Sequence, residues 1–139
     1  MFRMLDEDSP ISGEEFLQFE EILGKKLPKT MLVFYLKHNG GQPQVRGVHD
    51  DCHIFPFNSF NSLEEMKKSL TWFDDEAVPE GFKATDLLHF AYDPGSGNYA
   101  LSLRAEDYGK VYFYVLEEKA VLYGQWPSLE DFLNSFVEE

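Results

Sequence analysis

The residues best suited to chemistry lie in one short run, His49-Asp50-Asp51-Cys52-His53. Two imidazoles, two carboxylates and one thiol so close together could bind zinc or another divalent ion, because these groups are common metal ligands. The spacing matches no strong zinc motif, however, and no second ligand pair is evident elsewhere in the sequence. We therefore interpret the run as a polar hairpin turn and predict neither a metal nor another cofactor. A metal-dependent enzyme built on the segment from His49 to His53 is the less favoured alternative.

Other arrangements that could support catalysis are weaker. Cys52 is the single cysteine, and the neighbouring Asp50 and Asp51 would oppose formation of the thiolate that a nucleophile requires. The glycine-rich piece at residues 94–98 lacks the lysine of a phosphate-binding loop and leads into a strand pattern rather than a helix. No serine occupies a nucleophile-elbow pattern. The sequence thus predicts a protein that is not an enzyme.

Length and charge limit the possible partners. The 139 residues suit one domain, 1–139, in which residues 1–10 form a frayed acidic lead-in. The net charge is −13, from 25 acidic and 12 basic residues, which disfavours direct contact with nucleic acid or an anionic membrane and is compatible with a basic protein partner. A single cysteine and a start without a signal-peptide pattern predict a cytoplasmic protein. The oligomeric state is left open.

The elements that must position any site follow from periodicity and end signals. Four helices are predicted at residues 12–23, 28–38, 63–73 and 129–137, three of them with a serine and an acidic residue spaced as in a helix N-terminus. Strands are predicted at residues 44–48, 52–57, 87–92, 99–103, 111–116 and 120–123. Separate helical and strand runs predict an α+β domain, an antiparallel sheet of about four to six strands with four helices packed on it.

A series of short motifs in this order resembles the SUKH superfamily. The first is Leu27-Pro28, an aromatic-rich helix and Asn39-Gly40-Gly41. The others, spread over roughly residues 11–137, are Ile54-Phe55-Pro56, Ser62-Leu63-Glu64-Glu65, Phe90-Ala91-Tyr92-Asp93 with Gly95, Gly97 and Asn98, Gly109-Lys110-Val111-Tyr112-Phe113, and Ser128-Leu129-Glu130-Asp131-Phe132-Leu133. That superfamily includes Smi/Knr-type regulators of fungal cell-wall synthesis and many bacterial immunity proteins.

The resemblance implies a non-enzymatic, protein-binding domain, most simply an immunity protein that neutralises a cognate toxin, frequently a nuclease. The alternative it implies is a Smi/Knr-like regulatory interaction module. Because a nuclease needs a basic cleft, we expect a basic toxin domain to be the partner and exposed acidic turn residues to bind it. These residues are Asp50, Asp51, Asp74, Asp75, Glu76, Asp93, Glu106 and Asp107.

Overall fold

The computed structural model describes residues 3–138, without the side chains of Arg46 and Glu138. Within that range the helices are α1 (Gly13–Leu23), α2 (Lys29–Lys37), α3 (Leu63–Ser69) and α4 (Leu129–Leu133). The strands are β1 (Met4–Leu5), β2 (Gln42–Pro43), β3 (Val45–His49), β4 (Ile54–Pro56), β5 (Ser59–Phe60), β6 (Leu87–Tyr92), β7 (Gly97–Ser102), β8 (Val111–Leu116), β9 (Ala120–Trp126) and β10 (Phe136–Glu138). Short 3-10 helices are η1 (Asp75–Ala77), η2 (Ala84–Asp86) and η3 (Ala105–Asp107).

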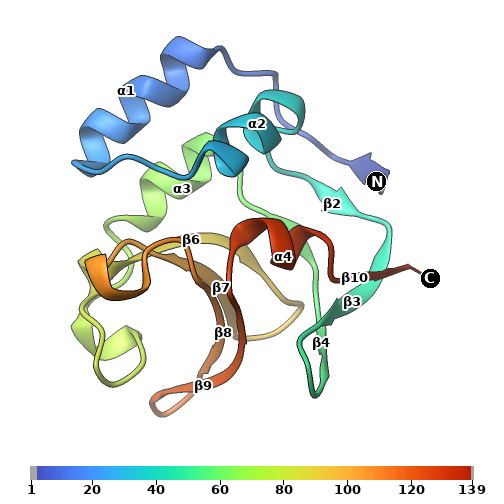
Figure 1. Ribbon diagram of the computed structural model, residues 1–139, viewed down its shortest axis with the longest axis vertical. Coiled ribbons are helices and arrows are strands. Elements are labelled where there is room, and N and C mark those ends of the chain that lie inside the picture. The colour runs from blue at the N-terminus through green and yellow to red at the C-terminus, as the bar shows by residue number, and fades with distance from the viewer. Residues whose placement is uncertain (1–2, 139) are drawn as a thin grey trace.

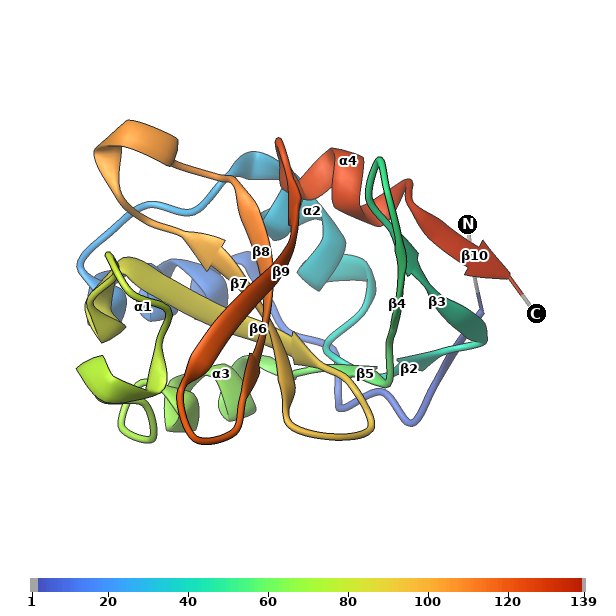
Figure 2. The ribbon, with the colours of Figure 1, turned by 90° about the horizontal axis from the view of Figure 1, so that it is seen from below.

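The strands form antiparallel sheets, which confirms the predicted α+β class. The largest sheet has the order β5-β6-β7-β8-β9, a second has the order β10-β3-β4, and β1 pairs with β2. Figure 1 shows α1, α2 and α3 on one side of the five-stranded sheet, with α4 between that sheet and the β10-β3-β4 sheet. Figure 2 shows the opposite, outer face of the five-stranded sheet, with the helices behind it. The strand pairing therefore divides the predicted single sheet into three.

The hydrogen bonds expected at two of the predicted helix starts are present in the structure. At α1, the Glu15 backbone N–H donates to Oγ of Ser12 at 3.1 Å, and the Ser12 N–H donates back to the Glu15 carboxylate at 3.2 Å. Ser62 and Glu65 form the same reciprocal pair at α3. Such pairs satisfy amide groups that have no partner in the first helical turn. Sequence spacing alone was sufficient to place these two starts.

The Asn39-Gly40-Gly41 motif joins α2 to α3 and to the N-terminal segment. The buried Asn39 side chain accepts a hydrogen bond from the backbone of Leu63 and donates one to the carbonyl of Ser9, each at 2.8 Å. Gly40 has a φ of 81°, and a Cβ there would lie 2.8 Å from the backbone nitrogen of Ser62. Only glycine suits a position with both properties. The motif thus fixes where α3 begins relative to α2.

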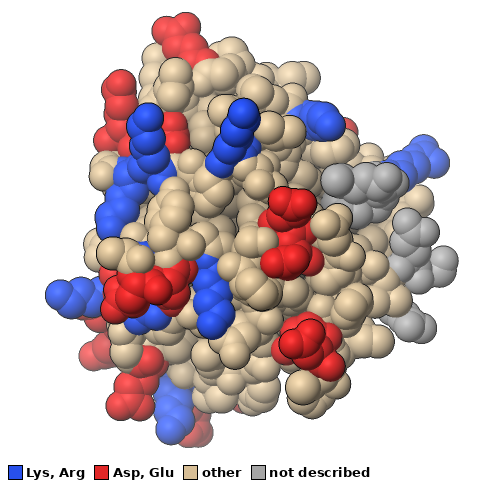
Figure 3. Space-filling view, viewed as in Figure 1, with Lys and Arg blue, Asp and Glu red and all other residues tan. Residues whose placement is uncertain are grey.

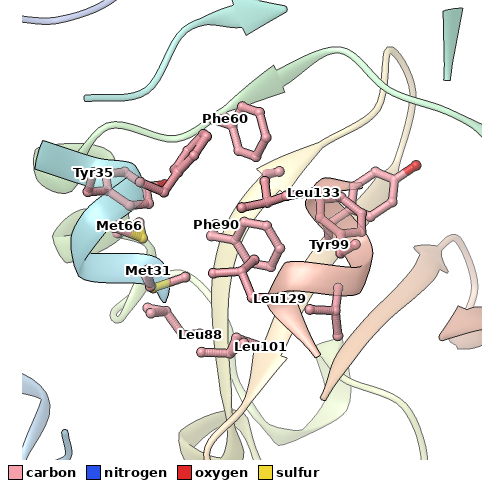
Figure 4. Packing of buried hydrophobic residues seen from close by; sticks show 14 of the residues in the cluster. Met31, Tyr35, Phe60, Met66, Leu88, Phe90, Tyr99, Leu101, Leu129 and Leu133 are labelled. Atoms are coloured by element: carbon pink, nitrogen blue, oxygen red, sulfur yellow. The ribbon is translucent and has the colours of Figure 1, made fainter. Parts of the chain in front are cut away.

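The main hydrophobic core fills the space between the helices and the inner face of the five-stranded sheet. Figure 4 shows side chains from α2, α3 and α4 packed against those of β6 and β7, including Met31, Tyr35, Met66, Leu129, Leu133, Leu88, Phe90, Tyr99 and Leu101. A smaller cluster lies on the outer face and consists of Val78, Leu87, Ala100, Tyr112 and Tyr114. The segment at residues 74–86 therefore covers part of the outer face through Val78.

Two predicted helices are shorter than expected. Helix α3 ends at Ser69 rather than near Phe73. Helix α4 ends at Leu133, so the prediction that Phe136 is helical is wrong. Phe136 lies instead in β10, opposite Val48 of β3. Sheet pairing at this position replaces the next helical turn. Among residues 3–138, none of the helices could span a lipid bilayer.

Candidate functional site

The candidate site is a groove on the outer face of the five-stranded sheet, at the edge nearest α3. The strand register places Tyr92 opposite Asn98, and Asn98 opposite Tyr114, so that these residues form a row across β6, β7 and β8. The groove has a volume of about 440 Å³ and is lined by Asn61, Glu65, Ser69, Trp72, Phe73, His89, Tyr92, Gly95, Ser96, Gly97, Asn98 and Leu116. It is thus built from α3, the segment after it and the β6–β7 turn.

The wall on the α3 side comes from the way this helix ends. The amides of Leu70, Thr71 and Trp72 each bond to the carbonyl three residues earlier, which tightens the chain into 3-10-type turns. The hydroxyl of Ser69 also bonds to the carbonyl of Met66 at 2.7 Å, and such bonds compete with the helical pattern. As a result Trp72 is 66% exposed at the groove.

The opposite wall is the β6–β7 turn, which Asp93 holds in shape. Oδ1 of Asp93 accepts hydrogen bonds from the amides of Gly95 and Gly97, each at 2.8 Å. A Cβ on Gly97 would lie 2.4 Å from the Asp93 carboxylate and 2.6 Å from the ring of Phe113. Asp93 is only 8% exposed, so the expectation that it is an exposed acid does not hold. Its hydrogen bonds to Gly95 and Gly97 fix the turn that forms this wall of the groove.

His89 and Phe73 form the buried end of the groove. Their rings are parallel within 3° with centroids 3.7 Å apart, and Nε2 of His89 shares a 2.7 Å hydrogen bond with the Tyr114 hydroxyl. Burial lowers the pKa of His89 to about 3, so the imidazole is neutral at physiological pH. The stacked pair therefore forms an uncharged floor at this end of the groove.

The predicted acids do not form one face. Asp50 and Asp51 lie at the tip of the β3–β4 hairpin, where Oδ1 of Asp50 accepts hydrogen bonds from the amides of Cys52 and His53 at 2.8 Å. Figures 1 and 2 both place this tip on the far side of the five-stranded sheet from the segment at residues 74–86. Asp50 and Asp51 are therefore separated from the groove.

Three other predicted acids follow Trp72 and Phe73 directly. Asp74 accepts hydrogen bonds from the amides of Glu76 and Ala77, and Asp75 accepts one from the amide of Ala84 at 2.8 Å. The Glu76 side chain is exposed. Asp74 and Asp75 thus shape this segment, while all three acids place negative charge beside the Trp72 wall.

Glu106 and Asp107 lie in the β7–β8 turn. The Asp107 carboxylate accepts hydrogen bonds from the Arg104 guanidinium and from the hydroxyls of Ser102 and Tyr112. Arg104 lies 3.9 Å above the Phe82 ring and donates to the carbonyl of Gly81. The hydrogen bond with Arg104 holds the pKa of Asp107 well below its usual range. This cluster fastens the covering segment to the turn.

Replacing Asp107 by asparagine is expected to lower the free energy of unfolding by about 1–3 kcal/mol at pH 7, because charge-assisted hydrogen bonds are lost. A depressed folded-state pKa stabilises the fold above the unfolded pKa of about 4, and that stabilisation fades as the pH falls toward the folded value. Urea unfolding of both proteins between pH 7 and pH 3 should therefore show a difference that shrinks with acidification. Glu106→Gln, at an exposed neighbour, is the control and should change little. A difference independent of pH would contradict this account.

The possible metal site does not assemble. Asp50 is occupied by the backbone of its own turn, the His53 ring lies 5.9 Å from the Phe55 ring, and Cys52 is exposed. Among residues 3–138, no three His, Cys, Asp or Glu side chains are arranged to hold a metal ion. The geometry therefore offers no support for the alternative of a metal-dependent enzyme.

A second hollow lies between α2 and α4, on the helical side of the molecule. It measures about 310 Å³ and is lined by Lys29, Thr30, Val33, Phe34, Lys37, His38 and Leu133. Figure 3, viewed as in Figure 1, shows basic and acidic side chains interspersed on this side rather than one acidic patch. Two lysines make this hollow a poor match for a basic partner.

Sequence reasoning missed the residues that line the groove. Trp72 carried a usable signal, because it falls outside the one-face pattern of Leu63, Met66, Leu70 and Phe73. A large aromatic residue at such a position indicates an exposed side chain. His89 and Asn98 carried no such signal, since the strand register alone brings them to the same face.

Comparison with known proteins places the chain in a family. The model of the SMI1 / KNR4 family (SUKH-1) matches residues 10–135. A search of curated proteins found no significant match. The family match includes α1 to α4 and all the residues that line the groove. Because it covers most of the chain, this protein belongs to the SMI1/KNR4 family, SUKH-1.

Proposed function

We propose that this chain is a cytoplasmic, non-enzymatic immunity protein that neutralises a cognate toxin, a basic domain such as a nuclease, by binding it at the Trp72 groove. Members of the family are generally binding domains rather than enzymes, and they include immunity proteins and Smi1/Knr4-like modules. A cognate partner that is not a toxin would place this chain among the latter.

The exposed Trp72 is the observation that carries the proposal. The indole is 66% exposed at the edge of a concave surface, so it can offer a large apolar contact area to another molecule. Tryptophan is among the residues that most often dominate binding energy at protein interfaces. Trp72 therefore has the properties of an anchor for a protein partner.

Charge supports a basic partner. Glu65 lines the groove, Asp74, Asp75 and Glu76 follow its Trp72 wall, and the whole chain carries −13. An acidic protein approaching a basic toxin cleft would associate rapidly and in a salt-sensitive manner. Occupying that cleft would exclude its nucleic-acid substrate.

Reversing the charge of one exposed acid in the segment that follows Trp72 should slow association with the cognate toxin domain. Glu76→Lys is expected to lower the association rate constant by about three- to tenfold at low salt, because it removes attraction and adds repulsion. The rate constants are measured by stopped-flow fluorescence over a series of sodium chloride concentrations.

Asp51→Lys is the matched control, since it makes the same change in charge at the distant, exposed β3–β4 tip. It should leave the rate within about twofold of the wild-type value. Equal effects of both reversals would refute the groove as the docking region, and salt-independent association would refute a basic partner.

A further inference from the structure

We infer that the groove contains a subsite for one arginine side chain of the partner protein, with its guanidinium stacked on Trp72 and its charge balanced by Glu65. The inference rests on the proposed function, which places a basic partner at this groove. It adds the chemistry of the group that enters.

The charge of the lining favours a cation. Among the described residues that line the groove, Glu65 is the only acidic one, no lysine or arginine is present, and burial keeps His89 neutral. By contrast, the hollow between α2 and α4 carries Lys29 and Lys37. The two concave surfaces therefore differ in the sign of the group that they would accept.

An unstacked ring face on Trp72 and an unbonded carboxylate oxygen on Glu65 suit a flat cation. Within residues 3–138, the Trp72 ring has no ring contact or side-chain hydrogen bond, so a face is available for stacking. Oε1 of Glu65 accepts the Ser62 amide at 2.9 Å, and its other carboxylate oxygen has no hydrogen bond among the described residues. An aromatic face and an open carboxylate that line the same groove match a planar guanidinium better than a compact ammonium.

The same combination already occurs inside this protein. The Arg104 guanidinium lies 3.9 Å from the centroid of the Phe82 ring and pairs with the Asp107 carboxylate. There, one arginine joins two segments that are distant in the sequence. Trp72 and Glu65 supply the same two kinds of group, an aromatic ring and a carboxylate, to one groove.

A small probe can test the subsite without the toxin. The ¹⁵N-labelled protein is titrated with N-acetyl-arginine methylamide, and its two tryptophan indole signals are followed by NMR. Trp126 is 3% exposed and its indole N–H donates to the carbonyl of His49, so its signal serves as an internal reference. We expect the Trp72 signal to shift along a saturable curve in the millimolar range, while the Trp126 signal stays in place.

Two comparisons isolate the charge. The citrulline analogue has the same shape but is neutral, and it should bind the wild-type protein about three- to fivefold more weakly than the arginine probe does. The arginine probe should bind the Glu65→Gln variant more weakly by a similar factor. Glutamine preserves the helix-capping hydrogen bond, and Glu64→Gln on the same turn is the control that should change nothing.

No saturable Trp72 shift, or equal shifts by arginine and citrulline, would overturn the arginine subsite. Tighter binding of N-acetyl-leucine methylamide would overturn it as well and would indicate an apolar anchor instead. These failures remain distinct from failure of the proposed function, because toxin binding that depends on Trp72 would persist in either case.

Discussion

Replacing Phe132 by alanine is expected to lower the free energy of unfolding by about 3–5 kcal/mol, the range for truncation of a fully buried phenylalanine. Phe132 lies on α4 and is 0% exposed. Its ring packs edge-to-face against Phe90, Trp126 and Phe136 with centroids 4.9 to 5.5 Å apart. These partners come from β6, β9 and β10, so the ring holds two of the sheets together.

Such a loss is a large share of the 5–15 kcal/mol that stabilises a typical domain. Urea unfolding monitored by circular dichroism measures it. Ile22→Ala, at a 63% exposed position on α1, is the control and should change stability by no more than about 0.5 kcal/mol. A loss below about 1 kcal/mol in Phe132→Ala would show that the Phe132 ring does not hold the two sheets together.

The parts of the fold that local chemistry decides could be predicted. The starts of α1 and α3 could be predicted from Ser12 with Glu15 and from Ser62 with Glu65, because the hydrogen bonds involved span only three residues. The α+β fold class could be predicted from the order of the helical and strand patterns. Phe136 shows the limit, because its helical spacing lost to pairing with Val48, a residue far away in the sequence.

The candidate site was less accessible to sequence reasoning. Composition identifies acidic turns. It does not reveal whether a given carboxylate faces solvent or accepts hydrogen bonds from the backbone of its own turn. Asp93 and Asp107 are the clearest cases, since the first organises a turn and the second pairs with Arg104. The groove itself depends on strand register and on the early end of α3, which act over long distances.

Replacing Trp72 by alanine is expected to weaken toxin binding by about 30-fold or more, which corresponds to a loss of at least ~2 kcal/mol of binding free energy at an interface anchor. The indole supplies a large, rigid contact surface in the groove and loses little conformational freedom on binding. Because the side chain is exposed, the stability of the free protein should change by less than about 0.5 kcal/mol. Folding and binding can therefore be separated.

Isothermal titration of the toxin domain with Trp72→Ala, Val33→Ala and Tyr123→Ala is the most direct measurement. Val33 lines the hollow between α2 and α4, and Tyr123 is an exposed aromatic residue on β9. We predict that Trp72→Ala alone loses affinity by about 30-fold, while the other two stay within about threefold of the wild-type protein. Wild-type affinity in Trp72→Ala, together with a large loss in Val33→Ala, would contradict the account and move the binding surface to the helical side.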